Sequence, residues 1–176
     1  ERVIKIDLLI KSDANKFMNQ FLKQSKRIKF QFSSRWYYAL KKWKEKYKTM
    51  LPDYFKDKKH VNSYVFVDVL TNLLTSDDAL VTGVGLDVVS VLQAFHVKEN
   101  QRVYVNKNFG QMGWCLPAAI GACIANNKKK TVLVTGDGSL QFNIHELGTI
   151  SYYHLPIKIF VFNNNGYKSI RDTQNN

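Results

Sequence analysis

The sequence Gly136-Asp137-Gly138-Ser139 is followed by Asn163-Asn164, and the second Asn lies 27 residues after Asp137. Each stretch comes directly after a short run rich in β-branched and apolar residues, at 131–135 and at 157–162. Such runs are typical of buried parallel strands. The pattern therefore predicts a carboxylate and a carboxamide at the carboxyl ends of two strands, with a helix between them. Open α/β sheets bind their ligands at that edge.

The side chains at these two strand ends suit a metal ion that is also bound to phosphate. Oxygen atoms from Asp137 and Asn164 are the ligands that Mg²⁺ prefers, with phosphate and water completing its octahedron. Gly136 and Gly138 let backbone N–H groups approach an anion, and the following helix adds its positive end. Two simpler interpretations exist, because Asp137 could end a strand in an Asx-turn and an Asn-Gly stretch could be only a loop.

Two further blocks accompany this pair and carry a resemblance to a known family. The blocks are Asn108-Phe109-Gly110-Gln111-Met112-Gly113, which runs into 116–121, and Asn163-Asn164-Asn165-Gly166-Tyr167. With the Gly-Asp-Gly-Ser stretch, they make residues from about 80 to 174 resemble the diphosphate-binding domain of the acetolactate synthase family. These are thiamine-diphosphate-dependent 2-oxo-acid decarboxylases and carboligases.

The resemblance implies a role for each matching residue. Asp137 and Asn164 would be the side-chain ligands of Mg²⁺, and Gly166 would supply a backbone carbonyl to the same ion. Backbone groups of Gly110 and Met112 would bond the aminopyrimidine ring, and the Met112 side chain would wedge the cofactor into a bent shape. The remaining cofactor-binding positions would be Gly136, Gly138 and Ser139, with the amides and hydroxyl of the last two holding the diphosphate.

The resemblance also implies an enzymatic function, in which the cofactor carries the difficult chemistry and the protein orients it. We expect decarboxylation of a pyruvate-like 2-oxo acid followed by carboligation. The alternative in the same cofactor class is a lyase or carboligase for a sugar, phosphonate or other non-pyruvate substrate. A different class is a non-catalytic interaction or nucleic-acid-binding module. FAD is a possible further cofactor that this chain does not indicate.

One part of the family's machinery is missing from the sequence. These enzymes use a glutamate on a separate pyrimidine-binding domain, and no segment here resembles that domain. Glu146 follows the Gly-Asp-Gly-Ser stretch too closely to be a good candidate, so no catalytic residue is assigned. We therefore expect the chain to be a fragment, or one of two subunits. Its partners would be a pyrimidine-binding domain and further copies in a homodimer or tetramer.

Composition narrows the remaining functional classes. The formal net charge is +12, but 17 of the 26 Lys and Arg residues lie in residues 1–60. The motif-bearing remainder is nearly neutral, which argues against nucleic acid as the partner. There is no apolar run of 18 residues to suggest a membrane span and no signal-peptide pattern. Cys115 and Cys123 lack metal-site spacing and are interpreted as buried thiols in a reducing, cytoplasmic setting.

The order of predicted elements indicates an α/β class, a parallel sheet with helices on both faces. Residues 1–30 are predicted to be the tail of a preceding central domain, 31–60 a helix and linker, and 61–176 the diphosphate-binding domain, whose C-terminal part could be incomplete. The predicted strands are 3–6, 79–82, 102–105, 131–135 and 157–162. The predicted helices are one capped by Ser12-Asp13, then 35–48, 62–74, 87–95, 116–125 and 140–153.

Overall fold

The computed structural model describes residues 5–29 and 33–175 and divides the chain into two compact units, residues 1–47 and 48–176. The first unit contains helices α1 (Ala14–Ser25) and α2 (Ser34–Lys46). Each helix begins at a side-chain cap, because Asp13 accepts a hydrogen bond from the Lys16 N–H and Ser33 accepts one from the Trp36 N–H. Residues 3 and 4 of the predicted strand 3–6 lie outside the described residues, and Lys5 and Ile6 are not in a strand.

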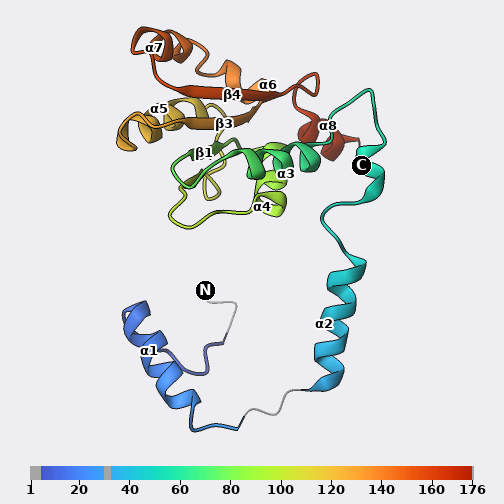
Figure 1. Ribbon diagram of the computed structural model, residues 1–176, viewed down its shortest axis with the longest axis vertical. Coiled ribbons are helices and arrows are strands. Elements are labelled where there is room, and N and C mark those ends of the chain that lie inside the picture. The colour runs from blue at the N-terminus through green and yellow to red at the C-terminus, as the bar shows by residue number, and fades with distance from the viewer. Residues whose placement is uncertain (1–4, 30–32, 176) are drawn as a thin grey trace. The chain divides into compact units, whose positions relative to one another are not determined.

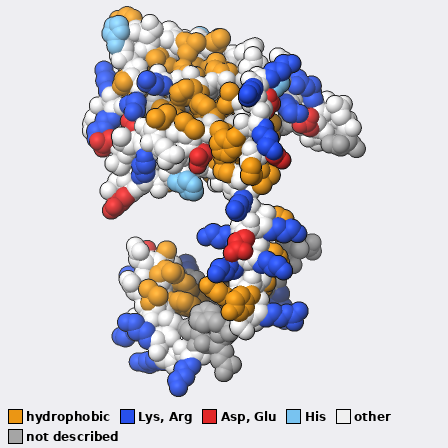
Figure 2. Space-filling model, turned by 45° about the vertical axis from the view of Figure 1, so that its right-hand side comes forward, with side chains coloured by type: hydrophobic (Ala, Val, Ile, Leu, Met, Phe, Trp, Pro, Cys, Tyr) orange, Lys and Arg blue, Asp and Glu red, His pale blue; other side chains and the backbone are white. Residues whose placement is uncertain are grey.

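The helices of the first unit bury none of their side chains. Figure 2 shows Lys and Arg side chains projecting from this part of the chain, with hydrophobic side chains exposed between them. The exposed hydrophobic residues include Phe21 on α1 and Trp36 on α2. These two helices therefore depend on local capping and propensity within the described residues rather than on a core of their own.

The second unit contains a four-stranded parallel sheet in the order β2-β1-β3-β4. Its strands are β1 (Ala79–Thr82), β2 (Val103–Val105), β3 (Thr131–Gly136) and β4 (Ile157–Phe162). The two central strands are almost wholly buried, as their β-branched sequences predict. All four predicted strands of this unit are therefore confirmed, and the parallel α/β class with them.

Helices cover both faces of the sheet (Figure 1). On one face, α3 (Ser63–Leu73) and α4 (Leu86–Ala94) pack Val67 and Val91 against the sheet. On the other face, α5 (Cys115–Ala125) packs Leu116 and Ala119 against the sheet. The alternation of side chains along a strand divides the core, so that Val132 faces the first cluster and Leu133 the second.

The single helix predicted over 140–153 is wrong, because the structure has two helices there. They are α6 (Asp137–Gln141) and α7 (Glu146–Tyr152). Between them the Asn143 side chain donates a hydrogen bond to the Gly113 carbonyl at 2.8 Å. The backbone then turns through hydrogen bonds between residues three apart, such as the one from the Glu146 N–H to the Asn143 carbonyl. This tertiary contact interrupts the helix.

Two further elements are not in the sequence prediction. The segment predicted as a linker contains a short 3-10 helix, η1 (Pro52–Phe55), which begins at Pro52. A last helix, α8 (Lys168–Gln174), follows the loop after β4. No described helix is both long and apolar enough to cross a membrane.

Candidate functional site

The site lies at the carboxyl ends of β3 and β4, where the sheet register places Gly136 opposite Phe162. The chain leaves β3 directly into α6, whose first residue is Asp137. It leaves β4 into residues 163–166, which we call the 163–166 loop. The two polar stretches that the sequence analysis paired are therefore brought side by side by adjacent parallel strands.

The carboxylate of Asp137 organises this edge through three backbone N–H donors. Its Oδ1 accepts from the Gly138 N–H at 2.8 Å. Its Oδ2 accepts from the Gly166 N–H at 2.8 Å and from the Asn164 N–H at 3.3 Å. One side chain at the start of α6 thus fixes the backbone of the 163–166 loop, which explains why an acidic residue at this spacing from the Asn pair matters.

The side chain of Asn164 carries an unusual oxygen. Its Oδ1 is buried and has no hydrogen-bond partner in the structure. A buried carbonyl oxygen without a partner is costly, and a cation is one group that would satisfy it. Asp137, Asn164 and the Gly166 carbonyl offer oxygen donors of the kind Mg²⁺ takes, and in this structure the Gly166 carbonyl accepts a hydrogen bond from Arg171. The residues present therefore fit the expected metal ion.

This donor set is not a cluster of charged ligands. Nowhere in residues 5–29 and 33–175 do three or more His, Cys, Asp or Glu side chains gather so as to hold a metal ion. A metal at this edge would depend on one carboxylate, one carboxamide and a backbone carbonyl. Such a set leaves much of the ion's charge for phosphate oxygens, as is usual for Mg²⁺ bound with a phosphorylated ligand.

The Gly110–Gly113 segment, which precedes α5 in the sequence, lies at the same edge of the sheet. The Gly113 N–H donates to Ser139 Oγ at 3.0 Å, and the Gly113 carbonyl accepts from Asn143. Gly113 has a φ of +85°, a left-handed conformation that favours glycine. A Cβ on Gly113 would also lie only 2.7 Å from the Cβ of Phe142. This segment is therefore locked to the helix pair α6–α7 by conformation and by packing.

The backbone at Gly138 is tightly enclosed. A Cβ added there would lie 3.1 Å from Cε1 of Tyr167 and 3.3 Å from Cε of Met112. Met112 and Tyr167 thus approach Gly138 from two different segments. A glycine at this position allows the backbone to lie close to both side chains.

These residues line an open cavity of about 1170 Å³ within the second unit. The expected cofactor-binding residues on its wall are Gly110, Met112, Gly136, Asp137, Gly138, Ser139 and Asn164. Gly166 is not part of the wall, because its N–H faces Asp137 and its carbonyl accepts from Arg171. Glu146, the poor candidate for the activating glutamate, is not part of the wall either.

Two charged residues at the site are not among the predicted site residues. Asp87 lies in the first turn of α4, lines the cavity and is buried. Burial raises the pKa of its carboxyl, although its Oδ1 accepts a 2.7 Å hydrogen bond from the Gly85 N–H. Arg171 on α8 contacts the 163–166 loop, and its only sequence signal is that it follows the Asn-Gly stretch.

Comparison with known proteins agrees with this geometry. Residues 83–176 match the family described as thiamine pyrophosphate enzyme, C-terminal TPP binding domain. The chain is 34% identical over 139 residues to the acetolactate synthase large subunit of Porphyra purpurea, covering 79% of this chain and 23% of that protein. It is 27% identical over 174 residues to the acetolactate synthase large subunit of Lactococcus lactis, covering 98% of this chain and 29% of that protein.

A solved structure supports the fold. A protein from Mycobacterium smegmatis described as a thiamin diphosphate-dependent enzyme superposes with a TM-score of 0.53 at 24% identity. The match covers 61% of this chain and 22% of that one. The chain thus spans between a fifth and a third of the length of these relatives. Because the family match covers more than half of the residues, the chain belongs to the thiamine pyrophosphate enzymes, through their C-terminal TPP-binding domain.

Proposed function

We propose that this chain supplies the diphosphate- and Mg²⁺-binding part of an enzyme that decarboxylates a pyruvate-like 2-oxo acid and transfers the remaining unit to an acceptor. The observation that carries the proposal is the meeting of Asp137 with the 163–166 loop at the ends of two adjacent strands. The acetolactate synthase relatives support the reaction class.

The metal would be held by Asp137, Asn164 and the carbonyl of Gly166. The unpartnered Oδ1 of Asn164 and the carboxylate of Asp137 would both gain a partner. The ion would offset the charge of the diphosphate and fix the cofactor by its phosphate end. In this proposal the metal ion anchors the diphosphate and offsets its charge. It takes no part in the reaction, which occurs at the other end of the cofactor.

The remaining site residues would hold and shape the cofactor. The backbone at Gly136 and Gly138 and the hydroxyl of Ser139 would receive the diphosphate. The backbone of Gly110 and Met112 would bond the aminopyrimidine, with the Met112 side chain as the wedge. When bound, thiamine diphosphate supplies the stabilised carbanion that decarboxylation requires. The residues of this chain would orient it, with the activating glutamate expected on another domain.

Completion of the site would require a second domain. A glutamate from a pyrimidine-binding domain, on the same or another chain, would face the cofactor, and assembly would be a homodimer or tetramer. We place the functional boundary near residue 61, with 1–30 as the tail of a central domain and 31–60 as a helix and linker. The proposed compartment is the cytoplasm.

The reaction is tested with the full-length protein by measuring CO₂ release from pyruvate in the presence of thiamine diphosphate and Mg²⁺. We expect release that chelator removes and that Asp137→Ala abolishes. Cofactor-dependent turnover of a sugar or phosphonate, with none of pyruvate, would replace the pyruvate assignment by the alternative substrate class. Turnover that persists in Asp137→Ala would contradict the assignment of the metal ligand.

A further inference from the structure

The guanidinium of Arg171 lies against the carbonyl side of the 163–166 loop. Its Nη2 donates to the Asn164 carbonyl at 2.9 Å, and its Nη1 donates to the Asn165 carbonyl at 2.7 Å. The same Nη1 donates to the Gly166 carbonyl. Three backbone carbonyl oxygens from consecutive residues thus converge on one positive charge.

This convergence places opposite charges on the two sides of one loop. The N–H groups of Asn164 and Gly166 point to the Asp137 carboxylate, while the carbonyls of the same residues point to Arg171. These backbone groups are therefore hydrogen-bonded without a metal ion, whereas Asn164 Oδ1 is buried and unpartnered. Backbone carbonyls gathered in this way are also good ligands for hard cations. Arg171 occupies a place where a cation is favourable.

We propose that the guanidinium of Arg171 competes with the metal ion for the Gly166 carbonyl, so that metal binding displaces the guanidinium from the 163–166 loop. This inference rests on the proposed function, in which Gly166 is a metal ligand. A carbonyl oxygen has two lone pairs, but two cations on one oxygen repel each other at short range. Arginine cannot escape this repulsion by losing its proton.

The rival role for Arg171 is a brace that holds the loop ready for metal. The two roles predict opposite signs when the charge is removed. Arg171→Gln keeps an N–H donor but loses the charge, so competition predicts tighter metal binding and a brace predicts weaker binding. Arg171→Lys keeps the charge with fewer fixed donors. Competition therefore predicts that this variant stays close to wild type.

The test measures Mn²⁺ affinity with thiamine diphosphate present, from the loss of the free-ion electron paramagnetic resonance signal. We expect Arg171→Gln to lower the dissociation constant about three- to tenfold, as removal of a nearby like charge does in largely aqueous surroundings. Lys158→Gln removes the same charge at an exposed position near the start of β4 and serves as the matched control. Its affinity should match wild type.

The outcomes separate this inference from the proposed function. Wild-type protein that retains no Mn²⁺, or an Asp137→Ala variant that binds it normally, counts against the metal site itself. Wild-type binding with Arg171→Gln unchanged or weaker overturns the competition by Arg171. A tightening that Lys158→Gln reproduces also overturns it, because the effect would then be one of net charge.

A second readout follows the guanidinium itself. In wild-type protein without metal, the Arg171 Nη protons should be protected from exchange with water by the three carbonyls. Adding Mg²⁺ and thiamine diphosphate should speed their exchange, observed by nitrogen-detected magnetic resonance of arginine side chains. Protection that is unchanged by loading would show that the guanidinium stays on the loop and would overturn the inference.

Discussion

The two units of this chain form helices for different reasons. Helices α1 and α2 are capped and amphipathic, yet they bury no side chain. Helices α3, α4 and α5 bury apolar side chains against a parallel sheet whose central strands are inaccessible. An apolar stripe in a sequence therefore predicts a helix well, but it does not show what the stripe packs against.

The sharpest test of this difference is the same substitution in both units. Leu133 on β3 is 0% exposed, and Leu22 on α1 is 55% exposed. Leu133→Ala should lower the free energy of unfolding by about 2–5 kcal/mol, because it removes buried surface and leaves a cavity. Leu22→Ala should change it by less than about 0.5 kcal/mol.

Urea unfolding can follow the second unit alone through Trp114. Replacing Trp36 and Trp43 by Phe makes Trp114 the only tryptophan in the chain. Equal losses of unfolding free energy for the two Leu→Ala variants would contradict this expectation, because α1 would then contribute to the stability of the second unit.

A smaller effect tests packing beside the site. Gly113→Ala would place a Cβ against Phe142 at a left-handed φ, so it should cost about 1–3 kcal/mol. Gly148 lies within α7 with open space around it, and Gly148→Ala should stabilise by about 0.5–1 kcal/mol. Thermal unfolding of both variants checks the prediction. If Gly113→Ala left the free energy of unfolding unchanged, the turn between α6 and α7 would not be held in place by its packing against Gly113.

Asp78 tests the contribution of a buried charge next to β1. Burial alone would raise the pKa of its carboxyl, but hydrogen bonds from the Thr75 N–H and hydroxyl and the ion pair with Lys130 hold it below its ordinary value of 3.8. Because the folded pKa is lowered, this stabilisation is present above about pH 4 and is lost as the pH falls through the folded pKa.

Asp78→Asn should therefore cost about 1–2 kcal/mol at pH 7 and less once the pH falls below the folded pKa of Asp78. Unfolding free energies of wild type and variant across this range provide the measurement. A cost that is independent of pH would show that the charge of Asp78 is not the stabilising feature.

The smallest expected effect compares two helix caps. Asn62 caps α3 by accepting from the N–H groups of Tyr64 and Val65, and Asp13 caps α1. Asn62→Ala should cost the second unit about 1 kcal/mol. Asp13→Ala should lower helicity by circular dichroism without moving the Trp114 transition. If Asp13→Ala also shifted the Trp114 transition, α1 would contribute to the stability of the second unit, contrary to this expectation.

The sequence predicted the four strands of the sheet because buried parallel strands need continuous β-branched runs, which are visible locally. The strand predicted over 3–6 has no such support, and Lys5 and Ile6 are not in a strand. It predicted that Asp137 and Asn164 meet, because adjacent parallel strands end at one edge. It could not predict the break between α6 and α7, since that break depends on Asn143 reaching Gly113, 30 residues earlier. The contacts of Arg171 also depend on a helix, α8, that shows no strong periodicity.

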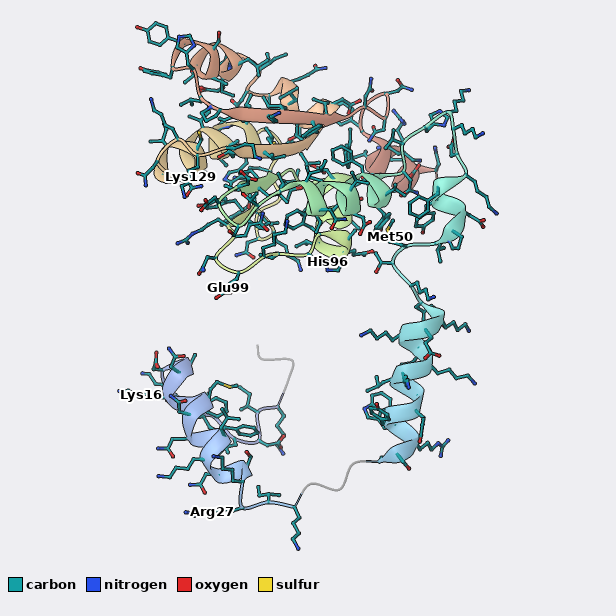
Figure 3. All side chains as sticks on the ribbon, in the orientation of Figure 1. Lys16, Arg27, Met50, His96, Glu99 and Lys129 are labelled. Atoms are coloured by element: carbon teal, nitrogen blue, oxygen red, sulfur yellow. The ribbon has the colours of Figure 1, made fainter. Side chains whose placement is uncertain are left out.

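Anchoring of the diphosphate by a metal ion is tested by calorimetric titration of thiamine diphosphate into this polypeptide, with Mg²⁺ and then with excess chelator. We expect Mg²⁺-dependent binding that Asp137→Ala abolishes. The matched control is Asp77→Ala, an exposed carboxylate paired with Lys129 (labelled in Figure 3), which should bind as wild type does. Binding that survives both the chelator and Asp137→Ala would contradict a metal-anchored diphosphate at the ends of β3 and β4.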